Sequence, residues 1–164
     1  MIQIKVGVIT CSDKGVKGQR VDTSGEYIKE YMTSIGFEVV NKVIISDDLE
    51  TIKNKLLYFS DELKVDLILT TGGTGFSPRD NTPEATKEVI IREVPGISEM
   101  LRYESYQITK KAYLSRGVSG IRNRTLIINL PGSLKAVKET LSFLDNVFDH
   151  GLKILKNVDS ECGE

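Results

Sequence analysis

A glycine-rich segment in the middle of the chain constrains the fold more than any other feature of the sequence. Residues 70–86 read TTGGTGFSPRDNTPEAT, after the apolar run 65–69 and before a helix start at 83–86. A short apolar run bounded by glycine is typical of a buried strand, and proline followed by an acidic residue is typical of a first helical turn. The segment predicts a strand that passes through a glycine loop into a helix, as in α/β folds.

The loop has the composition of an anion-binding site. Glycine adopts backbone conformations that other residues avoid, so the successive amides of residues 72–75 can point at one anion. Arg79 supplies a cation suited to phosphate oxygens, and Asp80 supplies a carboxylate. The spacing matches neither a P-loop nor the dinucleotide fingerprint, and the alternative that the glycines only reverse the chain stays open.

Strand and helix patterns alternate along the chain. We expect strands at 4–10, 37–45, 65–70 and 125–130, and an irregular strand or hairpin arm at 114–121. We expect helices at 23–35, 49–63, 83–92, 97–108 and 134–155. A loop at 12–22 precedes the first helix, which Thr23 or Ser24 can cap, and Pro95 and Gly96 are expected to break the chain. Alternation of this kind predicts the α/β class: a single three-layer domain whose mostly parallel sheet is covered by helices on both faces. The domain is expected to span residues 1–158, followed by a loose tail at 159–164.

Parallel sheets bind ligands beyond the carboxyl ends of their strands. Three segments with small or polar residues follow strands in this way: 10–13, 71–80 and 129–133. We therefore expect these segments to meet at one edge of the sheet.

Composition excludes several classes of function. The formal net charge of the 164 residues is −1 with acids and bases interspersed, so we expect no binding to nucleic acid. No apolar stretch approaches the ~20 residues that span a bilayer, and the amino terminus lacks the plan of a signal peptide. The two cysteines, Cys11 and Cys162, suit a reducing compartment. These features predict a cytoplasmic protein that does not contact membranes.

Histidine and cysteine chemistry is not expected. His150 is the sole histidine and lies in the last predicted helix, where we expect a surface or interface residue. No nucleophile elbow is present, and the counts exclude a metal site built from histidine and cysteine. Cys11 is expected to be a small packing residue.

The sequence resembles the molybdopterin adenylyltransferase family of molybdenum cofactor biosynthesis. The resembling segments are 70–86, LSRGVSGIRNRTLIINLPGS at 114–133 and, more loosely, VITCSDKG at 8–15. The resemblance implies a domain that binds ATP and molybdopterin, uses Mg²⁺, transfers AMP to the terminal phosphate of molybdopterin and releases pyrophosphate. A partner protein then inserts the metal, and family members form homo-oligomers, most often trimers.

The resemblance also implies roles for individual residues. Asp80 is expected to be catalytic, arranging Mg²⁺ and the attacking phosphate, and Asp47 is a second catalytic candidate; other metal ligands stay unassigned. Asp47 and Asp48 also suit an ordinary helix cap, and Asp48 is the counterpart if the alignment shifts by one. Asn81 departs from the family, which usually has valine there, but the acting side chain is that of Asp80.

The substrate-binding candidates come from the same three segments. Ser12 and Asp13 resemble the loop that lines the nucleotide, and Ser115 and Arg116 resemble residues that face the pterin or its phosphate. The full set is Ser12, Asp13, Thr71, Gly72, Gly73, Thr74, Gly75, Arg79, Ser115, Arg116, Asn129, Pro131 and Gly132.

The leading hypothesis is an ATP-dependent molybdopterin adenylyltransferase. A non-catalytic molybdopterin-binding or scaffold protein with the same domain is the alternative, and a hydrolase of nucleotide conjugates is a third. The sequence does not decide whether the assembly is a trimer or a hexamer, or whether the host pathway inserts molybdenum or tungsten.

Overall fold

The computed structural model describes residues 2–156, so the expected tail at 159–164 and Cys162 lie outside the described residues. The strands are β1 (Lys5–Cys11), β2 (Glu38–Ile45), β3 (Leu67–Thr71), β4 (Arg92–Glu93), β5 (Ser119–Arg122) and β6 (Thr125–Leu130). The α-helices are α1 (Asp13–Val16), α2 (Thr23–Ser34), α3 (Leu49–Leu57), α4 (Thr82–Val89), α5 (Pro95–Tyr106) and α6 (Leu134–Leu155). A π-helical turn η1 (Tyr58–Glu62) extends α3, and a 3-10 helix η2 (Lys110–Leu114) follows α5.

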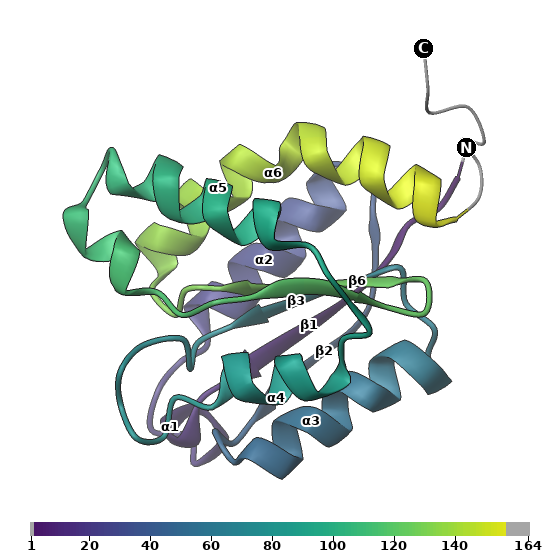
Figure 1. Ribbon diagram of the computed structural model, residues 1–164. Helices are drawn as coiled ribbons and strands as arrows, with labels where there is room; N and C mark the ends of the chain where they lie inside the picture. Colours follow the sequence, from purple (N-terminus) through teal and green to yellow (C-terminus); the bar gives the residue numbers. More distant parts are fainter. Residues whose placement is uncertain (1, 157–164) are drawn as a thin grey trace.

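The strands form a mostly parallel sheet in the order β2-β1-β3-β6-β5-β4. Strands β2, β1, β3 and β6 run parallel to one another. Strand β5 pairs antiparallel with β6, and β4 pairs antiparallel with β5. Helices α2, α5 and α6 cover one face, and α3 and α4 cover the other (Figure 1). The predicted α/β class, with helices on both faces of the sheet, is confirmed.

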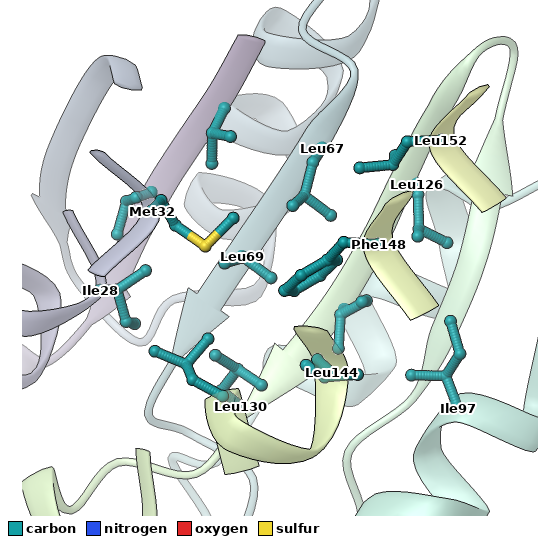
Figure 2. Close-up of a cluster of buried hydrophobic side chains, with 14 of the residues drawn as sticks. Ile28, Met32, Leu67, Leu69, Ile97, Leu126, Leu130, Leu144, Phe148 and Leu152 are labelled. Carbon is teal, nitrogen blue, oxygen red and sulfur yellow. The ribbon is translucent and has the colours of Figure 1, made fainter. Parts of the chain in front are cut away.

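The core forms because side chains of a strand alternate between the two faces. Val6 and Val8 of β1 point into the cluster under α2 and α6, whereas Ile9 and Cys11 point into the cluster over α3 and α4. In the first cluster, Phe148 of α6 lies against the leucines of the sheet (Figure 2). Burying each such side chain stabilises the fold by about 1.5–3 kcal/mol. The core thereby fixes the strand ends on which the site is built.

Two helix starts differ from the sequence prediction. The segment 12–22, expected to be a loop, contains the one-turn helix α1, because the Ser12 hydroxyl accepts a hydrogen bond from the amide of Gly15 at 2.9 Å. The cap of α2 is Asp22 rather than Thr23 or Ser24, since the Asp22 carboxylate accepts from the amide of Gly25 at 2.9 Å.

The region around Pro95 also differs. Pro95 begins α5 instead of breaking the chain, because its fixed φ suits the first helical position and needs no amide donor there. Helix α4 ends at Val89, before the expected 92, because residues 92–93 form β4 and pair with β5. A strand of two residues has no detectable period, so the sequence could not predict it.

Candidate active site

A cavity of about 600 Å³ lies at the carboxyl edge of the sheet, beyond the ends of β1 and β3. Thr10 and Cys11 line it from β1, and Thr71 lines it from β3. Strand β2 lies on the other side of β1, so the direction of the sheet order reverses at this point. The ligand-site rule for such sheets therefore holds here, and the volume suits a nucleotide-sized ligand.

The glycine loop wraps the edge of the cavity in a shape that requires glycine. Gly72 has φ +93° and Gly73 has φ +69°, in the left-handed region. A Cβ on Gly72 would lie 2.5 Å from the carbonyl oxygen of Cys11, and one on Gly73 would lie 2.3 Å from Oγ1 of Thr82. Thr82 also holds the two carbonyls: its hydroxyl donates to the oxygen of Gly72 at 2.9 Å and its amide to that of Gly73 at 3.2 Å.

The next two carbonyls of the loop are held by Arg116. Its amide donates to the oxygen of Thr74 at 2.9 Å, and its Nε donates to that of Gly75 at 2.7 Å. In a trans peptide the carbonyl and the following amide point in opposite directions. The amides of Gly73, Thr74 and Gly75 therefore face away from α4 and Arg116, and within residues 2–156 none has a hydrogen-bond acceptor. Such a run of amides can bind an anion.

Asp13, Asp47 and Arg79 form a hydrogen-bonded network in the cavity wall. The amide of Asp13 donates to Oδ2 of Asp47 at 2.9 Å, and the amide of Asp47 donates to Oδ1 of Asp13 at 3.0 Å. Arg79 binds the Asp13 carboxylate with two nitrogens, Nε at 3.1 Å and Nη2 at 3.0 Å. All three residues line the cavity, so the segments after β1, β2 and β3 converge.

The two carboxylates titrate in opposite directions. The hydrogen bond from Arg79 holds the pKa of Asp13 below its ordinary value. Burial raises the pKa of Asp47, and the negative charges of Asp13 and Asp80 raise it further. The hydrogen bond from the Asp13 amide and the charge of Arg79 offset this only in part, and a cation bound beside Asp47 would stabilise its ionised form.

Two helix amino termini face the cavity. Thr23 and Ser24 at the start of α2 and Ser133 and Leu134 at the start of α6 line it. The hydroxyl of Ser24 donates to the carbonyl oxygen of Gly132 at 2.8 Å and so ties the two starts together. At the start of α6 the amides of residues 134 and 135 have no acceptor within residues 2–156, whereas at the start of α2 the amides of Thr23 and Gly25 are already bonded to Val21 and Asp22. The positive end of a helix dipole favours phosphate groups, most clearly where amides are free.

Part of the cavity wall was not predicted from the sequence. Arg20, Asp22 and Ser77 also line the cavity. Asp22 also accepts a hydrogen bond from Thr10 Oγ1 at 2.9 Å, so it fixes the end of β1. Its position just before a helix was the available signal, since aspartate is a preferred cap.

Asp80 and its neighbours are placed differently from Asp47. Oδ2 of Asp80 accepts from the amide of Ser77 at 3.0 Å and closes the turn of the loop, and Asp80 does not line the cavity. Thr74 and Gly75, which were predicted to bind substrate, do not line the cavity. The side chain of Asn81 donates to the carbonyl oxygen of Asp47 at 2.9 Å, so this departure from the usual valine connects α4 to the acidic wall.

The remaining candidates lie on the far side of β6. Ser115, Asn129 and Pro131 line a separate cavity of about 230 Å³ that is also lined by α5 and α6. The Asn129 side chain is engaged internally, because its Nδ2 donates to the hydroxyls of Thr70 and Thr86, each at 3.0 Å. Gly132 lines the main cavity. The structure therefore divides the predicted third segment between two cavities.

Cys11 and His150 are not placed for catalysis in the described structure. Cys11 is buried, and burial raises the pKa of its thiol to about 12, as a packing role requires. His150 is exposed on α6. Within residues 2–156, no group of three histidine, cysteine or acidic side chains is arranged to hold a metal ion, and no helix is long and apolar enough to cross a membrane.

Known proteins resemble this chain over most of its length. Residues 7–149 match the family described as a probable molybdopterin binding domain. The chain is 41% identical over 143 residues to the molybdopterin adenylyltransferase of Helicobacter pylori J99, covering 86% of this chain and 81% of the relative. It is 40% identical to the molybdenum cofactor synthesis protein cinnamon of Drosophila melanogaster, covering 94% of this chain and 26% of that protein.

Solved structures agree. The molybdopterin biosynthesis enzyme MoaB of Thermus thermophilus superposes with a TM-score of 0.89 at 45% identity, over 94% of this chain and 98% of that one. The chain belongs to the molybdopterin-binding-domain family of molybdenum cofactor biosynthesis.

Proposed function

We propose that this protein is a molybdopterin adenylyltransferase, which moves AMP from ATP to the terminal phosphate of molybdopterin and releases pyrophosphate. The observation that carries the proposal is a cavity large enough for a nucleotide, in which the glycine loop at Gly72 and Gly73 meets Asp47 and Arg79. Family membership and the name of the Helicobacter pylori relative support the same activity.

For this transfer, the protein needs mainly to position the two substrates and to stabilise the charge that develops. An oxygen of the terminal phosphate of molybdopterin forms a bond to the α-phosphorus of ATP, and the bond from that phosphorus to the bridging oxygen breaks. The electron pair leaves with pyrophosphate, so no proton must be removed from the nucleophile. The loop amides, the starts of α2 and α6, and Arg79 would hold the phosphates and stabilise the departing charge.

Mg²⁺ fits the site through Asp47. Mg²⁺ in nucleotide sites commonly takes one or two carboxylates together with substrate phosphates. The raised pKa of Asp47 marks an uncompensated negative charge in the cavity wall that a cation would relieve. When bound there, Mg²⁺ would neutralise charge on the triphosphate.

The two catalytic candidates receive different support. Asp47 lines the cavity, whereas Asp80 closes the loop turn and acts on Asp47 through its charge. We propose that Asp47 contacts the nucleotide and its metal ion. Asp80 stays a predicted catalytic residue, and its backbone position in the loop supports an ordering role as well.

Pyrophosphate release tests the activity. ATP and Mg²⁺ are incubated with and without molybdopterin, using wild type, Asp47→Ala and Asp80→Asn, where asparagine keeps an acceptor for the Ser77 amide. Release that depends on molybdopterin and falls about 10²-fold or more in Asp47→Ala is expected. Tight molybdopterin binding without pyrophosphate would instead favour the scaffold alternative.

We also propose a homo-oligomer, with a trimer favoured. Exposed apolar side chains on α5, η2 and the turn between them support it, since such clusters mark interaction surfaces. They are Tyr103, Tyr106, Ile108, Tyr113 and Leu114. Light scattering would give the molar mass of the assembly. Transfer of the product to a molybdenum-insertion protein, and a cytoplasmic location, stay predictions.

A further inference from the structure

Arg116 contacts the glycine loop from outside the main cavity. Its amide donates to the carbonyl of Thr74 at 2.9 Å, its Nε to that of Gly75 at 2.7 Å, and its Nη2 to that of Asp80 at 2.7 Å. Arg116 does not line the cavity in which the phosphates are proposed to bind. The guanidinium therefore binds the backbone of the loop, whereas the family resemblance implied that it faces the pterin or its phosphate.

Glu84 holds the guanidinium in this position. It lies in the first turn of α4, and its Oε1 accepts a hydrogen bond from Nη1 of Arg116. Its other oxygen, Oε2, is buried and has no hydrogen-bond partner in the described structure. Burial alone would raise the pKa of Glu84, but the hydrogen bond from Arg116 keeps it below the ordinary value. An unsatisfied buried oxygen is costly, and the ion pair with Arg116 is what holds Glu84 in this place.

We propose that Arg116, oriented by Glu84, is a positioning residue that fixes the conformation of the loop 74–80, and with it the neighbouring Gly73 and the loop residues Ser77 and Arg79 that line the cavity. A guanidinium is planar and rigid, so it fixes the separation of the two carbonyls that it binds, one at each end of the loop. Lysine carries the same charge but has no fork, and it cannot reproduce this constraint.

The orientation of the amides follows from the peptide geometry. With the carbonyls of Thr74 and Gly75 turned toward Arg116, the amides of Gly75 and Phe76 must face the opposite way. Without the guanidinium, the Gly75–Phe76 peptide plane would lose its anchor and would be free to rotate, whereas the carbonyl of Thr74 would still be held by the backbone amide of residue 116. The consequence for catalysis rests on the proposed function, but the ordering of the loop does not.

The test uses Arg116→Lys, Glu84→Gln, the double variant and the control Arg124→Lys, in the full-length protein. Arg124 lies in the β5–β6 turn, at the opposite end of the sheet from the cavity. The first readout is the rate of chymotryptic cleavage after Phe76, whose side chain is 71% exposed, measured without any ligand. The second is kcat and KM for pyrophosphate release.

Positioning predicts that both single substitutions raise the cleavage rate about 10-fold, because charged hydrogen bonds that close the loop are lost. It predicts that kcat falls about 10²-fold, as for small displacements of binding groups. The double variant should be no worse than Arg116→Lys, since the two residues act as one unit. The control should match wild type in both readouts.

A different pattern would overturn the proposal. Loss of activity in Arg116→Lys with full activity in Glu84→Gln and unchanged cleavage would mean that Arg116 acts on the ligand directly. Unchanged cleavage in both variants would overturn the ordering role whatever the activity. If wild type transfers no AMP, the proposed function fails, while the cleavage rates still decide the role of Arg116.

Discussion

At the scale of single residues, Asp47 and Asp48 are neighbours with different surroundings. Asp47 is partly buried in the cavity wall and bonded to the backbone of Asp13. Asp48 is exposed and caps α3, because its carboxylate accepts from the amide of Thr51 at 2.9 Å. The sequence left the choice between them open because both residues suit a cap. Only the fold shows that Asp47 lines the cavity and that Asp48 caps α3.

Substitution of each aspartate by alanine tests this assignment. We expect Asp47→Ala to lower the rate of AMP transfer about 10²–10³-fold, because a charge beside the phosphates is lost. Asp48→Ala should keep the rate and lower the melting temperature slightly, since α3 loses its cap. Steady-state kinetics and thermal melts measure both. Equal losses of rate would show that the acidic wall is not specific to Asp47.

The pH dependence of the rate provides a second test at this scale. The pKa of Asp47 is raised, so its ionised form is lost at a higher pH than for an ordinary aspartate. The rate should therefore fall on acidification from a pH above the ordinary value of 3.8. Asp13→Asn removes a like charge, and it should move this acid limb to lower pH. The pH–rate profiles of the two proteins check the direction, and a shift to higher pH would refute the coupling.

Asp47 affects the stability of the fold in the opposite direction: acidification lowers the rate but favours the folded state. An acid whose folded pKa is raised stabilises the fold at low pH, and that contribution is lost as the pH rises through the folded pKa of Asp47. The site therefore carries an energetic cost at neutral pH, as is common for functional carboxylates.

At the scale of elements, the glycine loop was predictable and its supports were not. The order strand, glycines, helix follows directly from residues 65–86. The supports are carbonyl contacts with Thr82 and Arg116, and backbone carbonyls leave no trace in a sequence. For the same reason, the commitment of Arg116 to the loop could not be predicted from its position 41 residues after Gly75.

Gly73→Ala tests the loop geometry, with Gly18→Ala as a matched control. Both glycines have left-handed φ values, +69° and +71°, but only at Gly73 would a Cβ meet a neighbour, Oγ1 of Thr82 at 2.3 Å. Gly18→Ala should cost only the backbone strain, about 1–2 kcal/mol. Gly73→Ala should cost about 3 kcal/mol or more and abolish nucleotide binding. Urea unfolding and nucleotide titration measure the two effects; equal unfolding free energies would show that the loop yields to the added carbon.

The antiparallel edge has its own anchor on the other face of the sheet. Arg122 of β5 binds the carboxylate of Asp61 in η1 with two nitrogens, at 3.0 and 2.8 Å, and this lowers the pKa of Asp61. A lowered pKa stabilises the fold above the ordinary value of 3.8, and the contribution is lost as the pH falls through the folded pKa.

Asp61→Asn should lower the unfolding free energy by less than about 1 kcal/mol at neutral pH, because the pair is partly solvent-exposed. The difference from wild type should shrink as the pH falls below 3.8 and the carboxylate of Asp61 becomes protonated, because it is then uncharged like the asparagine of the variant. Denaturant titrations across this pH range measure it. A difference that grows on acidification would contradict the ion pair.

At the scale of the whole molecule, the alternation of elements was sufficient to predict the layers. Val6, Val8 and Ile9 show why: consecutive strand residues are apolar toward both faces, so both faces must be covered by helices. The position of the cavity also follows, from the rule on strand ends. The separate cavity behind Asn129 did not follow, because whether that side chain turns to a ligand or to Thr70 depends on the packing of α5 and α6.

The central proposal is that the protein transfers AMP from ATP to molybdopterin. The most direct test is to follow a label in the α-phosphate of ATP. We expect the label to appear on molybdopterin, with one pyrophosphate released for each AMP transferred, as determined by mass spectrometry of the products. Label recovered as free AMP would indicate hydrolysis, and label that stays in ATP while molybdopterin binds tightly would indicate a binding protein. Either of these results would contradict the adenylyltransferase assignment.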